Sequence, residues 1–179
     1  MDKIHLLTYK NELKKIERLL KKDIKLLKIY DRNYEFPIHI ASYLGLEKMI
    51  DLFLKYDKDC LKYLDSKKRN GLYYLNKYPK LLPKYISKSE INNVDSKNLT
   101  PLSYYILHNK VLNQKILEIY KSNKANINLP DNDSPFTKII FNDPEKMKLI
   151  LEIFKIDINS YDKYGYTALH AALKINNLS

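Results

Sequence analysis

A weak internal repeat constrains this chain more than any other feature of its sequence. The segments that align are EFPIHIASYLG (35–45), NGLYYLNK (70–77), NLTPLSYYILHN (98–109), DSPFTKIIFND (133–143) and GYTALHAALKIN (165–176). One column of this alignment holds Pro37, Gly71, Pro101, Pro135 and Ala168, at steps of 34, 30, 34 and 33 residues, and one further step back lies Lys3. A period of this length is typical of solenoids, in which each repeat buries its apolar face only against its neighbours.

Each repeat has the pattern of two helices. Proline at the column position favours the first turn of an inner helix, where its missing N–H costs nothing. Apolar residues then recur at spacings of three and four in the outer-helix segments 46–56, 114–121 and 144–154. The predicted buried faces are Met49, Ile50, Phe53 and Leu54 in the first, and Met147, Ile150, Leu151 and Phe154 in the last. The stretch 11–30 has the same spacing with lysines on its other side, which favours the outer helix of a capping unit.

A tight turn should precede each inner helix. Three of these turns have Asn98, Asn132 or Gly165 at the position where the left-handed conformation is needed, and these residue types tolerate it. Tyr34 and Lys68 occupy that position in two other repeats. We therefore expect the turns that contain Tyr34 and Lys68 to be distorted.

The repeated pattern resembles the ankyrin repeat, whose consensus includes Asp-x-x-Gly-x-Thr-Pro-Leu-His-x-Ala. The copies that carry the resemblance are DRNYEFPIHIA (31–41), DSKNLTPLSYY (95–105) and DKYGYTALHAA (162–172). The third unit departs from it with Asn70-Gly71 in place of Thr-Pro, and the fifth has Leu129 in place of Asp. The resemblance implies an all-α fold, an ankyrin-repeat solenoid of stacked helix-turn-helix units.

We predict a single ankyrin-repeat domain over residues 1–179. Its expected units are about 1–30 as a cap, then 31–64, 65–94, 95–128, 129–161 and an incomplete unit at 162–179. The incomplete unit would leave an apolar side partly uncovered. We therefore expect a truncation at residue 179, a further domain beyond it, or dimerisation through that end.

The composition favours a reducing compartment. Cys60 is the only cysteine, no apolar leader precedes the first lysines, and no run approaches the roughly 18 apolar residues that span a bilayer. These features predict a cytoplasmic protein without a transmembrane segment. Degenerate arrays of this composition resemble those of large DNA viruses and intracellular bacteria, for which the location would be the host cytoplasm.

The sequence offers no constellation for catalysis, so we predict no enzyme activity, no cofactor and no metal site. His5, His39 and His170 share one repeat position, and the resemblance implies that they tie loops together by hydrogen bonds. His108 has no second ligand nearby, and Cys60 has no base that could activate its thiol.

Binding to another protein is the leading functional prediction. The resemblance implies contacts from the turn tips and the ends of the inner helices. The predicted partner-binding residues are Arg32, Asn33, Glu35, Tyr43, Lys67, Arg69, Tyr78, Lys97, His108, Lys163, Tyr164 and Tyr166. Tyrosine and arginine favour interfaces because they combine apolar area with a polar end. Such a protein could be a viral or bacterial effector or an adaptor.

The charge indicates what kind of partner to expect. The formal net charge is +11, and residues 61–129 carry 13 basic against 4 acidic residues. An acidic protein surface would complement this segment. The alternative is an electrostatic binder of nucleic acid or anionic membrane through 61–129. Nucleic acid is disfavoured because the sequence lacks a groove-reading helix and a periodic aromatic and basic pattern.

Overall fold

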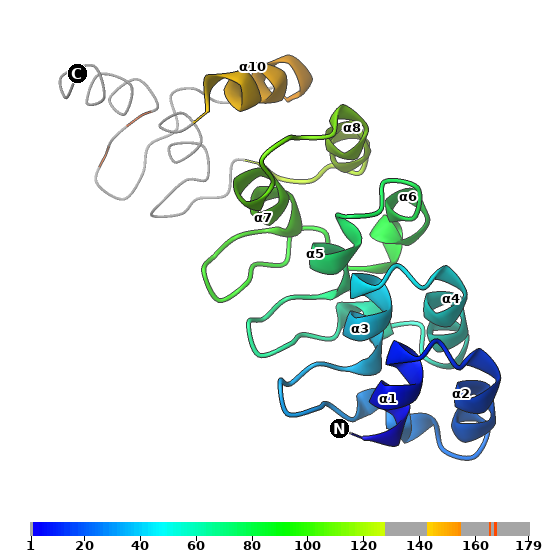
Figure 1. Cartoon of the computed structure of the whole chain (residues 1–179). Coiled ribbons are helices and arrows are strands. Elements are labelled where there is room, and N and C mark those ends of the chain that lie inside the picture. Colours follow the sequence, from blue (N-terminus) through cyan, green and yellow to red (C-terminus); the bar gives the residue numbers. More distant parts are fainter. Residues whose placement is uncertain (1, 128–142, 155–164, 166, 168–179) are drawn as a thin grey trace. The chain divides into compact units, whose positions relative to one another are not determined.

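The computed structural model describes residues 2–127, 143–154, 165 and 167 (Figure 1). Its contacts divide the chain into two compact units, residues 1–97 and residues 98–179. The elements of the first unit and those described in the second are helices joined by extended turns. This agrees with the predicted all-α class.

The repeat column marks where the inner helices begin. The inner helices of the first unit are α1 (Lys3–Tyr9), α3 (Pro37–Tyr43) and α5 (Gly71–Leu75), and the second unit has α7 (Pro101–His108). Each therefore starts at its column residue. Pro37 and Pro101 take the first helical position, as their fixed φ and missing N–H favour. Pro135 and Ala168 lie outside the described residues.

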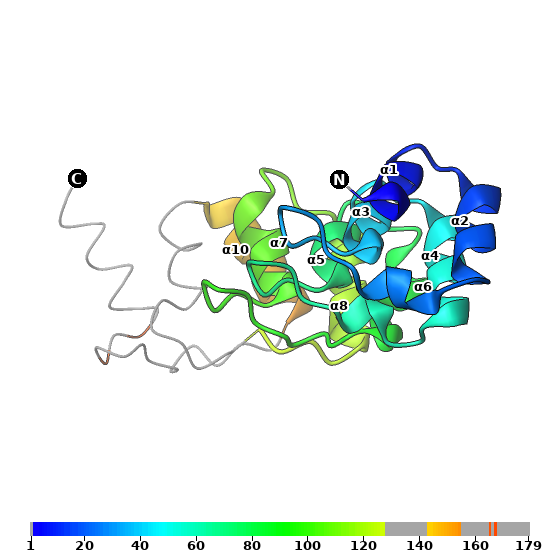
Figure 2. The same ribbon diagram turned by 90° about the horizontal axis from the view of Figure 1, so that it is seen from below.

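The outer helices form a second layer. They are α2 (Leu13–Leu20), α4 (Glu47–Tyr56) and α6 (Leu82–Tyr85) in the first unit, and α8 (Gln114–Ser122) and α10 (Pro144–Ile153) in the second. In the first unit, short 3₁₀ helices follow them, namely η1 (Ile24–Lys28), η2 (Cys60–Lys62) and η3 (Ile86–Lys88). Within that unit α1, α3 and α5 form one row and α2, α4 and α6 another (Figures 1 and 2).

The apolar faces pack between these helices largely as their spacing predicts. Met49, Ile50, Phe53 and Leu54 of α4 are all buried. In 144–154 the prediction was confirmed at Ile150 and Phe154 and was wrong at Leu151, which is 46% exposed. Met147 is only half-buried, and Ile153 completes the buried face. The stretch 11–30 is also not one helix: α2 ends at Leu20, and the Asp23 side chain caps η1 by accepting a hydrogen bond from the Lys25 main-chain N–H.

A repeated aspartate shapes the turns before α3, α5 and α7. Asp31 Oδ1 accepts hydrogen bonds from the main-chain N–H groups of Asn33 and Glu35 at 2.8 and 3.1 Å. Asp65 does the same for Lys67 and Arg69 at 2.8 and 2.9 Å. The three aspartates, Asp31, Asp65 and Asp95, are all buried. Each turn is therefore held from inside by a carboxylate of its own.

The expected distortion at Tyr34 and Lys68 does not occur. Their φ angles are 59° and 58°, the same as the 59° of Asn98. Tyrosine and lysine pay a steric cost in this left-handed region, about 1–2 kcal/mol per residue. The hydrogen bonds that the aspartate carboxylate accepts offset that cost, because they fix the main chain on both sides of the left-handed residue.

The histidines of the repeat tie neighbouring turns together, as predicted. His39 Nδ1 accepts a hydrogen bond from the Phe36 main-chain N–H at 3.0 Å, and its Nε2–H donates to the Tyr63 carbonyl at 2.8 Å. His5 Nε2 lies 3.0 Å from the Glu35 carbonyl. In the third repeat, the Tyr73 hydroxyl takes this role and donates to the Asn93 carbonyl at 2.8 Å. His170 lies outside the described residues.

Candidate functional site

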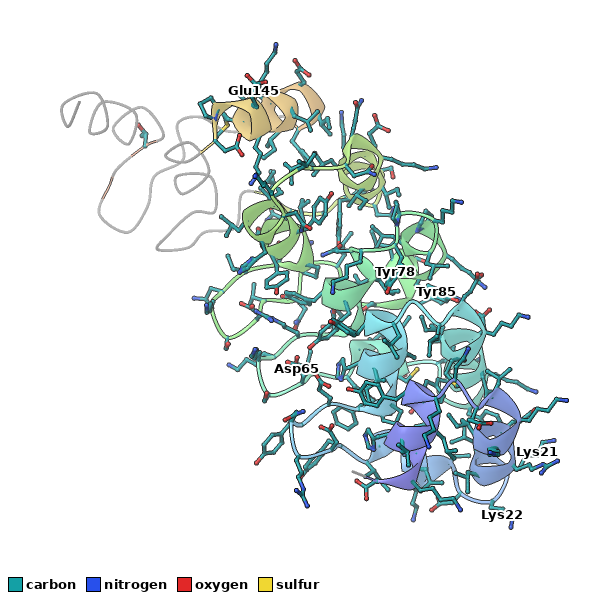
Figure 3. The ribbon with its side chains drawn as sticks, in the orientation of Figure 1. Lys21, Lys22, Asp65, Tyr78, Tyr85 and Glu145 are labelled. Atoms are coloured by element: carbon teal, nitrogen blue, oxygen red, sulfur yellow. The ribbon has the colours of Figure 1, made fainter. Side chains whose placement is uncertain are left out.

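The turn tips of the first unit expose basic side chains. Asp65 lies in the middle turn (Figure 3), and the three residues that follow each turn aspartate are exposed. The predicted contact residues that are exposed here are Arg32, Asn33, Lys67 and Lys97. The Ser96 main-chain N–H donates to the Lys67 carbonyl at 2.8 Å, so the second and third tips are held side by side.

Arg69 belongs to the fold and not to this exposed surface. Its Nε and guanidinium N–H groups both donate to Asp95 Oδ2 at 3.0 Å. Only 11% of the Arg69 side chain is exposed, and Asp95 is fully buried. Removing one partner of such a pair leaves a buried charge, so the Arg69 guanidinium is committed to joining two turns.

Tyr43 is the most exposed tyrosine within the described inner helices, with 48% of its surface accessible. Three neighbours nevertheless hold it. The Tyr78 hydroxyl donates to the Tyr43 carbonyl at 2.8 Å, and Lys77 Nζ lies 4.0 Å from the centre of the Tyr43 ring. The Tyr74 ring meets it edge-on at 6.2 Å. Figure 3 shows Tyr78 beside the inner helices.

Sequence reasoning missed Tyr9, which extends this surface. Tyr9 is 44% exposed. Burial raises the pKa of its hydroxyl, and the nearby charges of Glu35 and Asp31 raise it further. The signal was present in the sequence, because Tyr9, Tyr43 and Lys77 all lie six residues after the column position. We call Tyr9, Tyr43, Tyr74 and Lys77 the tyrosine surface.

Glu35 borders the tyrosine surface with an unusual carboxylate. It is half-buried, and burial is the main cause of its raised pKa, followed by the charges of Asp31 and Asp65. Within the described part of the chain, its carboxylate makes no hydrogen bond or ion pair with another side chain. A partly desolvated carboxylate of this kind can accept hydrogen bonds from a bound molecule.

The remaining predicted contact residues belong to the second unit. His108, in the second unit, is exposed and stacks on Tyr104 with ring centroids 4.1 Å apart. Its Nδ1–H donates to the Tyr104 carbonyl at 3.0 Å. Lys163, Tyr164 and Tyr166 lie outside the described residues.

The Cys60 thiol is buried and is not activated as a nucleophile. Burial, and then the charge of Asp57, raise the pKa of the Cys60 thiol to about 12, so the thiol stays protonated and unreactive. The described residues contain no group of three or more His, Cys, Asp or Glu that could hold a metal ion. None of the described helices has both the length and the apolar character needed to cross a membrane.

Comparison with solved structures identifies the fold. The ankyrin repeat domain of Bcl-3, described as a unique member of the IkappaB protein family, matches with a TM-score of 0.83 and 18% identity, over 99% of this chain and 82% of that one. A chain from the complex of the predatory endopeptidase Bd0816 of Bdellovibrio bacteriovorus with immunity protein Bd3460 matches with a TM-score of 0.67 and 19% identity, over 100% and 94%. No family model and no curated protein matches the sequence.

The chain has the ankyrin repeat fold. The column residues that begin the inner helices, the left-handed turns and the histidine bonds between turns agree with the likeness to Bcl-3. At 18% and 19% sequence identity the comparisons show the fold alone.

Proposed function

We propose that this chain is a non-catalytic protein-interaction module that binds its partner through the turn tips and the tyrosine surface. The observation that carries the proposal is Tyr43, which is half exposed although three neighbours fix its position. An aromatic side chain that is already held loses little conformational freedom on binding. Tyrosines of this kind are enriched among the residues that dominate interface energetics.

The partner that best complements this surface is an acidic protein. Arg32, Lys67 and Lys97 extend from successive tips and form no ion pair with another described residue, and Lys77 lies over Tyr43. Glu35 adds a single acceptor for a donor group of the partner. The proposal includes a single array of repeats over 1–179. Its units begin near 31, 65 and 95, so each of these repeats has one turn tip.

Capture of a partner with matched variants tests the proposal. The chain would be used to isolate proteins from extracts of its source cell, or of the host cell, and the affinity of the purified partner would then be measured by calorimetry. Tyr43→Ala should weaken binding about 10- to 100-fold, the range for a central interface aromatic. Tyr30→Ala is the control, because Tyr30 is similarly exposed, at 53% against 48% for Tyr43, but stacks on Tyr34 outside the tyrosine surface.

Equal affinity of the Tyr43→Ala and wild-type chains would refute the proposed surface. Retention on immobilised DNA and heparin tests the electrostatic alternative through 61–129. Retention that falls steeply between about 50 and 200 mM salt would favour a nucleic acid partner. The proposed role as a viral or bacterial effector or adaptor in the host cytoplasm is tested by the identity of the captured partner and by where a tagged chain accumulates.

A further inference from the structure

A second surface lies in the outer-helix layer of the first unit, away from the tyrosine surface. The carboxyl end of α4 separates two shallow hollows of about 700 and 430 Å³. The first is lined by Ile24, Lys25, Lys28, Tyr56 and Asp57. The second is lined by Leu54, Lys58, Asp59, Lys62 and Lys88. Tyr56, Asp57 and Lys58 are consecutive, so the two hollows share one wall.

The two hollows have an excess of positive charge. Five lysines line them against two aspartates. Asp59 forms an ion pair with Lys62 at 2.7 Å, and Asp57 accepts a hydrogen bond from the Tyr63 hydroxyl. Lys25, Lys28 and Lys58 form no ion pair within the described part of the chain.

One lysine of the first hollow affects the charge of an aspartate in the second. Lys62 lowers the pKa of the Asp59 carboxyl by hydrogen bonding, and Lys28 from the other hollow lowers it further. A ligand that carries several negative charges could therefore contact both hollows at once. Lysine suits such a ligand because its ammonium group donates in any direction from a flexible stem.

Apolar surface lies between the lysines. Ile24, which is 57% exposed, and Tyr56 line the first hollow, and Leu54 lines the second. An exposed isoleucine offers no hydrogen bond and no charge to a phosphate group, so a ligand that contacts it must also have an apolar part. A segment that alternates acidic and apolar side chains would place both kinds of group against matching partners.

We infer that these hollows dock an acidic peptide segment of a second protein, with an apolar side chain seated between Ile24 and Tyr56. The paired hollows favour a peptide over a flat lipid surface, because a concave site receives a protruding side chain. They favour it over single-stranded nucleic acid because no exposed aromatic row is present among the lining residues on which successive bases could stack.

This inference goes beyond the proposed function, because it gives the chain two binding surfaces in different layers. The tyrosine surface belongs to α1, α3, α5 and the residues directly after α5, and the hollows lie at the carboxyl end of α4 and at η1, η2 and η3. Two partners could then be bound at once, and the chain would join them.

Binding of a defined peptide tests the inference on the whole chain. The probe is a fluorescent peptide with the repeated sequence Glu-Glu-Leu, and its affinity is measured by fluorescence anisotropy. Lys28→Glu combined with Lys58→Glu should weaken binding about tenfold or more, because two attractive contacts become repulsive. The control pair is Lys48→Glu with Lys80→Glu, two exposed lysines that precede or begin outer helices and line neither hollow.

Both pairs of substitutions reduce the net charge from +11 to +7, since each replacement removes one positive charge and adds one negative charge. The control pair should therefore change the affinity by no more than about twofold. A peptide with serine in place of leucine should bind more weakly than the Glu-Glu-Leu peptide. Circular dichroism melting of each variant shows whether it remains folded.

Three results would overturn the inference. The first is equal weakening by the two pairs of substitutions, which would indicate a general charge effect. The second is equal affinity for the leucine and serine peptides. The third is binding to vesicles of phosphatidylcholine and phosphatidylserine, or to single-stranded DNA, without binding to the peptide. Tyr43→Ala should leave peptide binding unchanged, so failure of the proposed function and failure of this inference are distinguishable.

Discussion

The position of the Tyr43 ring depends on Gly45, two residues further along the chain. Gly45 has a φ of +64°, and a Cβ atom built on it would lie 2.5 Å from Cε1 of the Tyr78 ring. Tyr78 is the residue whose hydroxyl holds the Tyr43 carbonyl. A side chain at position 45 would therefore push away one of the three contacts that fix Tyr43.

Gly45→Ala should destabilise the chain by about 2–3 kcal/mol, from the left-handed backbone and the displaced ring together. Urea unfolding followed by circular dichroism measures this change. Gly165→Ala is the matched control, because Gly165 has a φ of +80° but nothing lies within 4 Å of its Cβ position. That control should cost about 1–2 kcal/mol. Equal costs for the two substitutions would contradict the proposed contact with Tyr78.

Within the helical hairpins, His39 makes the stability of the second repeat depend on pH. Burial lowers its pKa, and its Nδ1 must stay unprotonated to accept the Phe36 N–H. In the unfolded chain His39 has a pKa of about 6.5. Below that value the unfolded state binds a proton that the folded state takes up only at lower pH, so stability falls as the pH decreases.

We expect His39 to reduce the free energy of unfolding by up to about 1.4 kcal/mol for each pH unit below 6.5, until its folded-state pKa is reached. The measurement is urea unfolding of the wild-type and His39→Gln chains from about pH 7.5 to about pH 5, a range that spans the unfolded-state pKa of histidine. The variant should be less stable at neutral pH and lose less stability on acidification. Parallel pH profiles for the two chains would rule out this role of His39.

The starts of the inner helices could be predicted from the sequence, but several details of the elements could not. A period near 33 and the prolines locate the starts, because these signals are local. The short helix α6 is held to α4 by the contacts of Lys84 and Tyr85 with Asp51, which no short pattern in the sequence reports. The regular turns at Tyr34 and Lys68 were missed because bonds from Asp31 and Asp65 override the residues' own preference.

The candidate site was predictable only in part, for a similar reason. Exposure of Tyr43 and Lys67 follows from their place in the repeat. The role of Arg69 does not, since its partner Asp95 lies 26 residues away. Tyr9 was overlooked because the first repeat lacks the turn by which the others align, although the spacing from Lys3 to Tyr9 matches that from Pro37 to Tyr43.

For the chain as a whole, the net charge of +11 affects stability as well as partner choice. The 32 lysines and arginines outnumber the 21 aspartates and glutamates, and the lysines of the two hollows repel one another. Salt screens this repulsion over a distance of about 10 Å at 0.1 M and about 3 Å at 1 M. The folded state should benefit more than the unfolded state, because folding brings the charges together.

Sodium chloride should therefore raise the thermal midpoint by about 2–4 °C, the shift that corresponds to about 1 kcal/mol in a chain of this size. Scanning calorimetry at low and moderate salt measures this shift. The chain with Lys28→Glu and Lys58→Glu should respond less, since part of the repulsion has been removed. A midpoint that is independent of salt in both chains would show that the charges are already compensated.

The buried turn aspartates have a consequence for engineering. Because the carboxylates of Asp31 and Asp65 hold the backbone of their turns, the side chains at 32, 33, 66 and 67 are free of that task. These positions could be randomised in a display library while the scaffold keeps its shape. A chain built in this way could be retargeted to a new antigen by exchanging only the outermost residues of each loop.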